Sequence, residues 1–239
     1  MVPQKVDTVD DFVPFREGAR TMLVGSSGSG KTKFISRLVQ ERNHFFEVPP
    51  PKVIFCSHSG SREQHTSELQ KELVSNDGRH SPLVEFINHV PDNSELFEPH
   101  TMLIFDDMLS DEDSAANLQR LLSFFRRRAH HERLYCFITA QSLFSKLRDF
   151  GDLSQNASYM LLFKSPRMMQ QIRYFATQLT GVECARAICE AYKDIMKRFR
   201  FPHMYLSFHP LTNEKTFCLA NLFADEDKPI VSYLLSGAE

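Results

Sequence analysis

The sequence has no tryptophan, few cysteines, almost no net charge and no long apolar run. No apolar stretch approaches the ~20 residues that cross a bilayer, so we expect no membrane-spanning helix and no membrane partner. The first residues also lack the charged and apolar regions of a secretory signal peptide. These absences favour a protein that stays inside the cell.

The net charge of −2 excludes a uniformly basic protein that coats nucleic acid, although local basic loops remain compatible with it. The five cysteines form no C-x-x-C pair, and three of them lie in apolar runs, which favours buried, reduced thiols. Phenylalanine is abundant, with 21 residues, and predicts a core rich in that side chain.

One glycine-rich segment, residues 25–32, matches the phosphate-binding pattern G-x-x-x-x-G-K-[ST] at every fixed position. It comprises Gly25, Ser26, Ser27, Gly28, Ser29, Gly30, Lys31 and Thr32. A short apolar run precedes it and an amphipathic helix follows, which is the context that the motif requires. The pattern predicts an ATP site in which Lys31 reaches the β- and γ-phosphates and the Thr32 hydroxyl ligates Mg²⁺. The alternative is a plain glycine-serine turn.

The rest of the chain alternates strand and helix patterns. Strands are expected at 21–24, 52–56, 84–87, 102–105, 134–139 and 159–163; helices at 33–42, 115–129, 168–179 and 185–199, with a further loop and helix within 57–73; and a closing hairpin at 205–208 and 216–219. Continuous apolar runs indicate strands that are buried on both faces. The pattern predicts one three-layer α/β domain over residues 1–239, with a mostly parallel central sheet and a C-terminal hairpin.

Two carboxylates end the apolar run at 102–105. Ligands bind beyond the carboxyl ends of parallel strands, so Asp106 is expected to face Thr32 and to hold Mg²⁺ through water. Asp107 would then orient or deprotonate the attacking water. An ordinary Asp-Asp turn after a strand is the alternative.

A polar residue also follows the apolar run at 134–139. Gln141 is predicted to hydrogen-bond the γ-phosphate or its attacking water, or else to cap the strand end. Lys31, Asp107 and Gln141 are therefore the candidate catalytic residues.

A basic segment follows the helix expected at 115–129, and a further arginine lies downstream. It is a candidate for an arginine finger that acts on a neighbour's nucleotide, or for a DNA contact, and equally for a solvated helix end. The nominated residues are Arg126, Arg127, Arg128 and Arg148.

With these residues in hand, the chain resembles the genome-packaging ATPases of large DNA viruses and Polinton-type transposons, within the FtsK–HerA group of P-loop motors. The matching segments are VGSSGSGKT at 24–32, LIFDDM at 103–108, RAHH at 128–131, FITAQSLF at 137–144, NASY at 156–159 and LFKSPR at 162–167. The resemblance covers a core of about residues 12–222. Many members of the wider superfamily carry Asp-Glu where this chain has Asp106-Asp107.

The resemblance implies the same site roles, with Gln141 as the γ-phosphate sensor. It also implies a ring of five or six copies that pulls double-stranded DNA into a capsid, with capsid or portal vertex proteins as partners. The expected location is the host nucleus, a viral factory or the virion. Two alternatives stay open: a nucleoside or nucleotide kinase with the basic segment as its lid, and a nucleotide-gated capsid assembly module.

Overall fold

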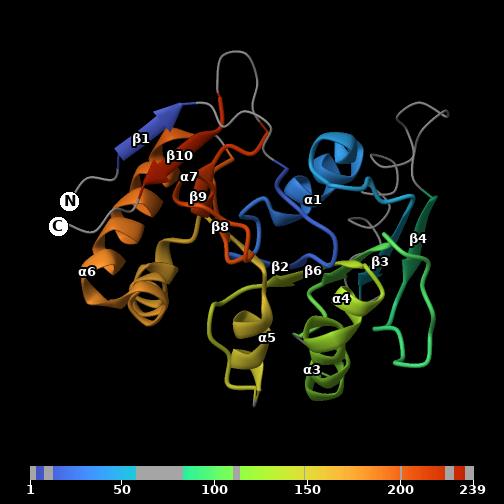
Figure 1. Cartoon of the computed structure of the whole chain (residues 1–239). Coiled ribbons are helices and arrows are strands. Elements are labelled where there is room, and N and C mark those ends of the chain that lie inside the picture. Colours follow the sequence, from blue (N-terminus) through green and yellow to red (C-terminus); the bar gives the residue numbers. More distant parts are fainter. Residues whose placement is uncertain are drawn as a thin grey trace.

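A single mixed sheet organises the molecule. The computed structural model describes residues 4–7, 13–57, 83–109, 114–147, 149–199, 201–223 and 229–234. Within these ranges the strands form one ten-stranded sheet in the order β1-β10-β9-β8-β7-β2-β6-β5-β3-β4 (Figure 1). The six strands from β7 to β4 run parallel, and the other four continue the sheet in antiparallel fashion.

The parallel strands lie where the apolar runs predict them. They are β2 (Arg20–Val24), β3 (Lys52–Ser57), β4 (Leu83–Ile87), β5 (Met102–Asp106), β6 (Tyr135–Ala140) and β7 (Tyr159–Phe163). Every residue of β6 and β7 is buried, as expected for strands covered on both faces. The α/β class and the mostly parallel sheet are thus confirmed, while the loop and helix expected within 57–73 fall outside the described residues beyond Ser57.

The antiparallel strands extend the sheet beyond β7. They are β8 (His203–Ser207), β9 (Cys218–Ala220), β10 (Val231–Leu234) and β1 (Gln4–Asp7). The pairing of β8 with β9 confirms the predicted hairpin, but its second strand begins at Cys218 and not at Thr216, because Thr216 and Phe217 lie in a helical turn. Its connection contains the short helix α7 (Glu214–Phe217), which Asn213 caps by accepting hydrogen bonds from two backbone N–H groups. Strands β1 and β10 lie outside the core of 12–222 that the resemblance covers.

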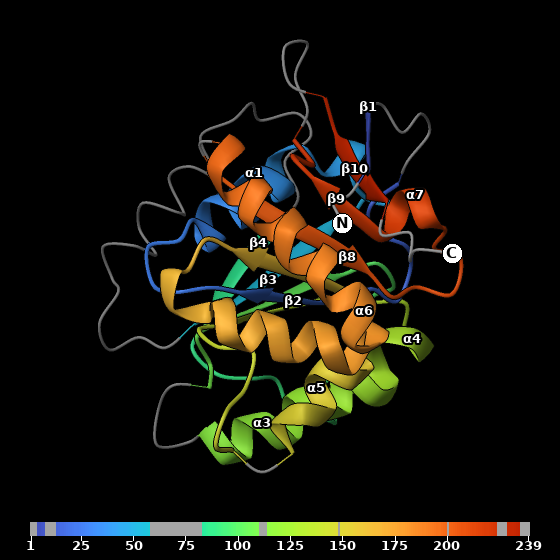
Figure 2. The same ribbon diagram turned by 90° about the vertical axis from the view of Figure 1, so that its left-hand side faces the viewer.

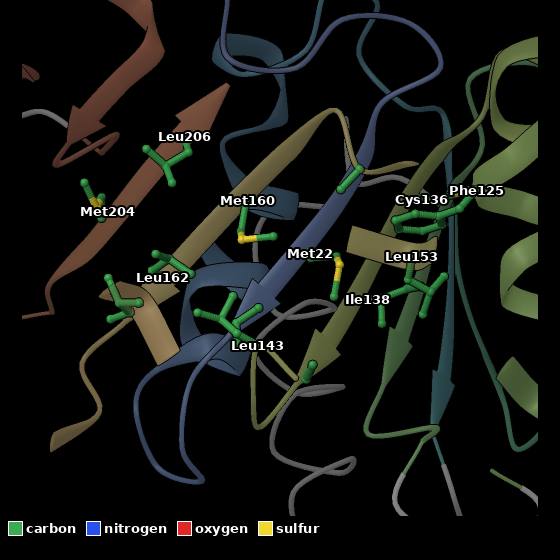
Figure 3. Packing of buried hydrophobic residues seen from close by; sticks show 14 of the residues in the cluster. Met22, Phe125, Cys136, Ile138, Leu143, Leu153, Met160, Leu162, Met204 and Leu206 are labelled. Carbon is green, nitrogen blue, oxygen red and sulfur yellow. The ribbon is translucent and has the colours of Figure 1, made fainter. Parts of the chain in front are cut away.

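Two apolar clusters occupy the two faces of the sheet, because successive strand side chains point to opposite faces. Leu23 belongs to the phenylalanine-rich cluster under α1 (Lys31–Gln40), which includes Phe34 and Phe163. Met22 and Val24 belong to the other cluster (Figure 3). The helices over that second face are α3 (Ser114–Ser123), α5 (Phe150–Asn156) and α6 (Met169–Arg198).

The helix expected at 115–129 differs from a regular α-helix in its last turns. After α3, residues Phe124–Arg128 form a π-helical segment, η2, and α4 (Ala129–His131) ends the run. The wider π turn brings both Phe124 and Phe125 into the core, where each is fully buried. Packing of the two aromatic rings therefore accompanies the departure from the regular 3.6-residue repeat.

Helix α6 contains the break that separates the two predicted helices. Gly181, with φ 77° and ψ 176°, is not helical, so the two halves meet there at an angle (Figure 2). The second half is anchored by Tyr192, whose hydroxyl donates to the Phe163 carbonyl at 2.9 Å and accepts from the Ser165 N–H at 3.2 Å. No described helix combines the length and the apolarity needed to cross a bilayer.

A buried histidine joins β8 to the phenylalanine-rich face. His203 packs edge-on against Phe34, with 4.8 Å between ring centroids. Its Nδ1 donates to the Phe201 carbonyl at 3.2 Å, and its Nε2 accepts from the Leu222 N–H at 3.4 Å. This pairing fits the neutral ring, and burial lowers the pKa of His203 to about 4.

Candidate functional site: a phosphate loop beside two acidic strand ends

The phosphate loop, residues 25–32, connects β2 to α1. Gly28 and Gly30 have φ values of 73° and 100°, which side chains of L-residues rarely adopt. An added Cβ at either glycine would meet no atom within 4 Å, so the backbone conformation and not crowding requires them. The N–H of Phe34 donates to the Gly30 carbonyl at 2.9 Å, so α1 begins directly at the loop. The N–H groups of its first turn, which have no acceptor one turn earlier within the helix, therefore lie at the loop.

Gly25 is required for a different reason. Its N–H donates to the Ala140 carbonyl of β6 at 3.0 Å, which fixes the chain as it leaves the sheet. A Cβ at Gly25 would lie 2.7 Å from both the Phe163 Cβ and the Ser29 Oγ. Contacts this short do not occur in folded proteins, so only glycine fits between β7 and the loop.

The interior of the loop carries a cation and a buried hydroxyl. Lys31 Nζ lies 2.5 Å from the Gly25 carbonyl oxygen and 3.1 Å from that of Ser26. The Ser29 hydroxyl is buried and has no hydrogen-bond partner among the described residues. Buried polar atoms are normally paired, and a phosphate bound in the loop would give the Lys31 ammonium a charged acceptor. The loop thus fits the phosphates of a nucleotide.

Two aspartates lie at the end of β5, and both are bonded to one hydroxyl of β6, Asp106 through its carboxylate and Asp107 through its backbone N–H. Thr139 Oγ1 donates to Asp106 Oδ1 at 2.7 Å and accepts from the Asp107 N–H at 2.9 Å. Thr139 is buried, and its χ1 freedom is further limited by its branched Cβ. Asp107 has a φ of 58°, a left-handed conformation in which aspartate is several-fold enriched. The turn after β5 is therefore built around Thr139.

Gln141, the predicted γ-phosphate sensor, contacts Asp107, the carboxylate predicted to act on the attacking water. Gln141 follows β6, and its Nε2 donates to Asp107 Oδ1 at 3.3 Å. In the register of the sheet, Val24 of β2 pairs with Ala140 of β6, and Phe105 of β5 pairs with Ile138. Gln141 therefore lies between the phosphate loop, which follows β2, and the pair Asp106-Asp107, which lies at the end of β5. Strands β2 and β5 are two strand spacings, or about 10 Å, apart.

A magnesium ion is the metal that this set of residues would hold. Thr32 lies in the first turn of α1, and Asp106 ends β5 at the same edge of the sheet. A hydroxyl and one carboxylate are a typical protein share for Mg²⁺, which keeps several waters and draws on substrate phosphates. The hydrogen bond from Thr139 holds the Asp106 carboxylate in place, and such bonds orient the groups that bind a metal ion or its water. The residues fit the ion.

Arg128 does not fit the role of an arginine finger or a DNA contact, because it is 6% exposed and bonded within the chain. Its guanidinium donates to both carboxylate oxygens of Glu132, at 2.7 and 2.9 Å, and to the carbonyls of Asp92 and Glu95. Its plane also lies over the ring of Phe124, 4.4 Å from the centroid. The prediction for Arg128 is therefore wrong, because the π turn directs this side chain into the protein.

The other nominated arginines lie at the surface or outside the described residues. Arg126 is half exposed and forms an ion pair with Asp152. Arg127 is exposed. Arg148 falls outside the described residues, so its role stays a prediction.

The basic segment and the phosphate loop lie at opposite ends of the parallel strands. Arg20, at the start of β2, donates to the Phe125 carbonyl at 3.2 Å, which places η2 near the amino ends of the parallel strands. The phosphate loop follows the carboxyl end of β2, and five residues of strand span about 16 Å. Arg126 and Arg127 could therefore act on a nucleotide only from a neighbouring copy.

Thr139 is the site residue that the sequence analysis missed. It is a polar residue inside an otherwise apolar strand, two positions before Gln141, and that position was the available signal. Because side chains alternate along a strand, Thr139 and Gln141 share one face, which is also the face that the acidic pair reaches.

Comparisons with known proteins give low similarity. Neither a family model nor a curated protein matches the sequence. Among solved structures, the genome packaging NTPase B204 from Sulfolobus turreted icosahedral virus 2, in complex with ATP-gammaS, is 12% identical with a TM-score of 0.46, covering 80% of this chain and 93% of that one. B204, the DNA-packaging ATPase from Sulfolobus turreted icosahedral virus, is 11% identical at 0.46, covering 81% and 94%.

A further structure, PH0250 from Pyrococcus horikoshii OT3, is 12% identical with a TM-score of 0.39, covering 64% of this chain and 85% of that one. All three TM-scores are below 0.5.

Proposed function

We propose that this chain is a Mg²⁺-dependent ATPase that drives the packaging of double-stranded DNA into a capsid. The observation that carries the ATPase is the meeting of three groups at one sheet edge. A phosphate loop, a pair of aspartates bonded to Thr139, and a glutamine bonded to Asp107 lie at the ends of three neighbouring strands. Such an arrangement suits attack of water on a γ-phosphate.

The site residues divide the work of binding and hydrolysis in this proposal. Lys31 and the backbone N–H groups of the loop bind the phosphates and offset their charge. Thr32 and Asp106 would hold Mg²⁺, which supplies further compensation of negative charge when bound. Asp107 orients the attacking water and accepts its proton, and Gln141 donates to Asp107 and aligns the same water. Thr139 keeps the Asp106 carboxylate and the Asp107 backbone in place.

The DNA-packaging part of the proposal rests on the motifs that follow the phosphate loop in the sequence. A net charge of −2 requires that any DNA contact come from local cations and not from the whole surface. Arg127 is one exposed candidate, and a neighbouring copy in a ring would bring it near DNA or near a second nucleotide. Binding that uses such contacts weakens steeply with salt.

The kinase alternative is disfavoured by the position of its supposed lid. The basic segment lies at the opposite sheet edge from the phosphate loop, and Arg128 is buried there. A lid must close over the phosphates. Phosphoryl transfer to nucleosides or nucleoside monophosphates by the purified protein would restore this alternative.

The test is steady-state ATP hydrolysis with and without double-stranded DNA, at low and high salt. We expect DNA to raise turnover, and Asp107→Asn to lower kcat by about 10²- to 10⁴-fold while nucleotide binding persists. Lys31→Ala should abolish nucleotide binding itself. A rate of ATP hydrolysis that is the same with and without double-stranded DNA would refute the translocase.

The same variants test the assembly module. Assembly lost with Lys31→Ala but kept with Asp107→Asn would favour a nucleotide-gated scaffold.

A further inference from the structure

The loop that begins with Gln141 is fastened to helix α6 by one side chain. Gln171 Oε1 accepts from the Leu143 N–H at 3.0 Å and lies 2.8 Å from the Ser142 hydroxyl oxygen. Gln171 lies in the first turn of α6, 30 positions beyond Gln141 in the sequence. The contact therefore joins two elements that only the fold brings together.

The backbone bond is the fixed part of this contact. A serine hydroxyl carries one proton, and the Ser142 Oγ also lies 2.7 Å from the Phe144 carbonyl oxygen, so it can donate to only one of two acceptors at a time. The Leu143 N–H has no such choice. Because an N–H can only donate, the atom of Gln171 that faces it is the carbonyl oxygen.

Three successive loop residues are held against the same face of α6. The Leu143 side chain is buried in the apolar cluster that α6 also joins (Figure 3). The Phe144 ring packs edge-on against Tyr174, with 5.4 Å between centroids. Gln171 and Tyr174 are three positions apart and so share one helix face. Each of residues 142–144 thus contacts α6 or the apolar cluster that it joins, and Gln141 directly precedes them.

We propose that Gln171 is a positioning residue that sets the orientation of Gln141 toward Asp107. This inference rests on the ATPase function proposed above, because its catalytic effect is exerted through Gln141. Loss of the Oε1 acceptor frees the start of the loop from α6. The backbone next to Gln141 is then no longer fixed, and the 3.3 Å hydrogen bond from Gln141 to Asp107 is formed less often. Nucleotide binding stays intact, because the phosphate loop belongs to β2 and α1.

The test compares three variants in the full-length chain. Gln171→Met keeps length and helix propensity but removes the amide acceptor, whereas Gln171→Glu keeps an acceptor oxygen at the same reach. Gln170→Met, at the exposed neighbouring position, is the matched control. Each is measured for kcat and KM of ATP hydrolysis, and for amide hydrogen exchange of residues 141–147.

We expect Gln171→Met to lower kcat by about 10- to 100-fold with KM within about twofold, since a misplaced group costs rate and not binding. Exchange in residues 141–147 should quicken by up to about tenfold. Gln171→Glu should retain most of the rate, and Gln170→Met all of it. In a Gln141→Ala background, Gln171→Met should cost nothing further.

Additive losses in that double variant, an equal loss in Gln171→Glu, or unchanged exchange in residues 141–147 would each overturn the inference. A wild-type chain without turnover would instead refute the ATPase, and the catalytic role of Gln171 with it. The exchange comparison would still decide whether Gln171 fastens the loop.

Discussion

Two threonines on adjacent strands offer a controlled test of how the acidic pair is held. Thr139 and Thr21 are both buried, on β6 and β2. The Thr139 hydroxyl bonds Asp106 and the Asp107 N–H, whereas the Thr21 hydroxyl has no hydrogen-bond partner among the described residues. Replacing either by valine removes the same hydroxyl and keeps the branched shape.

The expected effects differ in size and in sign. In Thr139→Val, a carboxylate loses a donor and a backbone N–H loses its acceptor, each costing about 1–3 kcal/mol when water cannot substitute. Because both aspartates are partly exposed, we expect a net loss of about 2 kcal/mol in the free energy of unfolding, which lowers Tm by about 4–8 °C. In Thr21→Val an unsatisfied hydroxyl becomes a methyl group, which should leave stability unchanged or raise it by up to about 1 kcal/mol.

Urea unfolding of the two variants beside the wild type measures both values, and ATP turnover measured on the same samples adds a second reading. Thr139→Val should also lower kcat, since the Asp106 carboxylate and the Asp107 backbone lose their common anchor, while Thr21→Val should not. If Thr21→Val costs as much as Thr139→Val, strand packing and not the hydroxyl explains the effect, and the role given to Thr139 is refuted.

Three further predictions concern stability. His203 has a pKa of about 4 in the folded chain and about 6.5 in the unfolded chain, so the unfolded chain binds more protons between these pH values. The free energy of unfolding should therefore fall by up to about 3 kcal/mol as the pH drops from 7 to 4. Urea unfolding at several pH values measures this change, and the His203→Phe variant should not show it. Arg128→Ala should lower the free energy of unfolding, measured by denaturation, by about 3 kcal/mol, and Arg127→Ala at the exposed neighbouring position by less than about 0.5 kcal/mol. Equal losses in the two variants would contradict the buried network around Arg128. Thermal melts should show that Gly151→Ala in α5 raises stability by about 0.5–1 kcal/mol and that Gly28→Ala lowers it by at least about 1 kcal/mol. The two differ because Gly28 has a positive φ and Gly151 does not.

The sequence predicted those parts of the fold that local patterns determine. Apolar runs located the six parallel strands, and the glycine pattern located the loop that follows β2. Asp107 and Gln141 were both singled out because each follows such a run. Their mutual hydrogen bond depends on strand order, which no single run contains.

The failures have one physical cause, since each depends on contacts between distant segments. Arg128 read as a surface cation because the helical repeat does not reveal the π turn that buries it. Strands β1 and β10 stabilise each other from opposite ends of the chain, and neither is long or apolar enough to be recognised alone. Thr139 and Gln171 act through partners 33 and 28 residues away in the sequence.

The left-handed backbone at Asp107 limits how this site can evolve. Aspartate tolerates a φ of 58° better than residues with longer side chains, because its short polar side chain can bond locally. A glutamate at this position would meet the same turn without that advantage. A lineage that lengthened this acid would therefore also have to rebuild the turn after β5 and its bond to Thr139. The two versions of the acidic pair would then be separated by a change in backbone and not only by one methylene group.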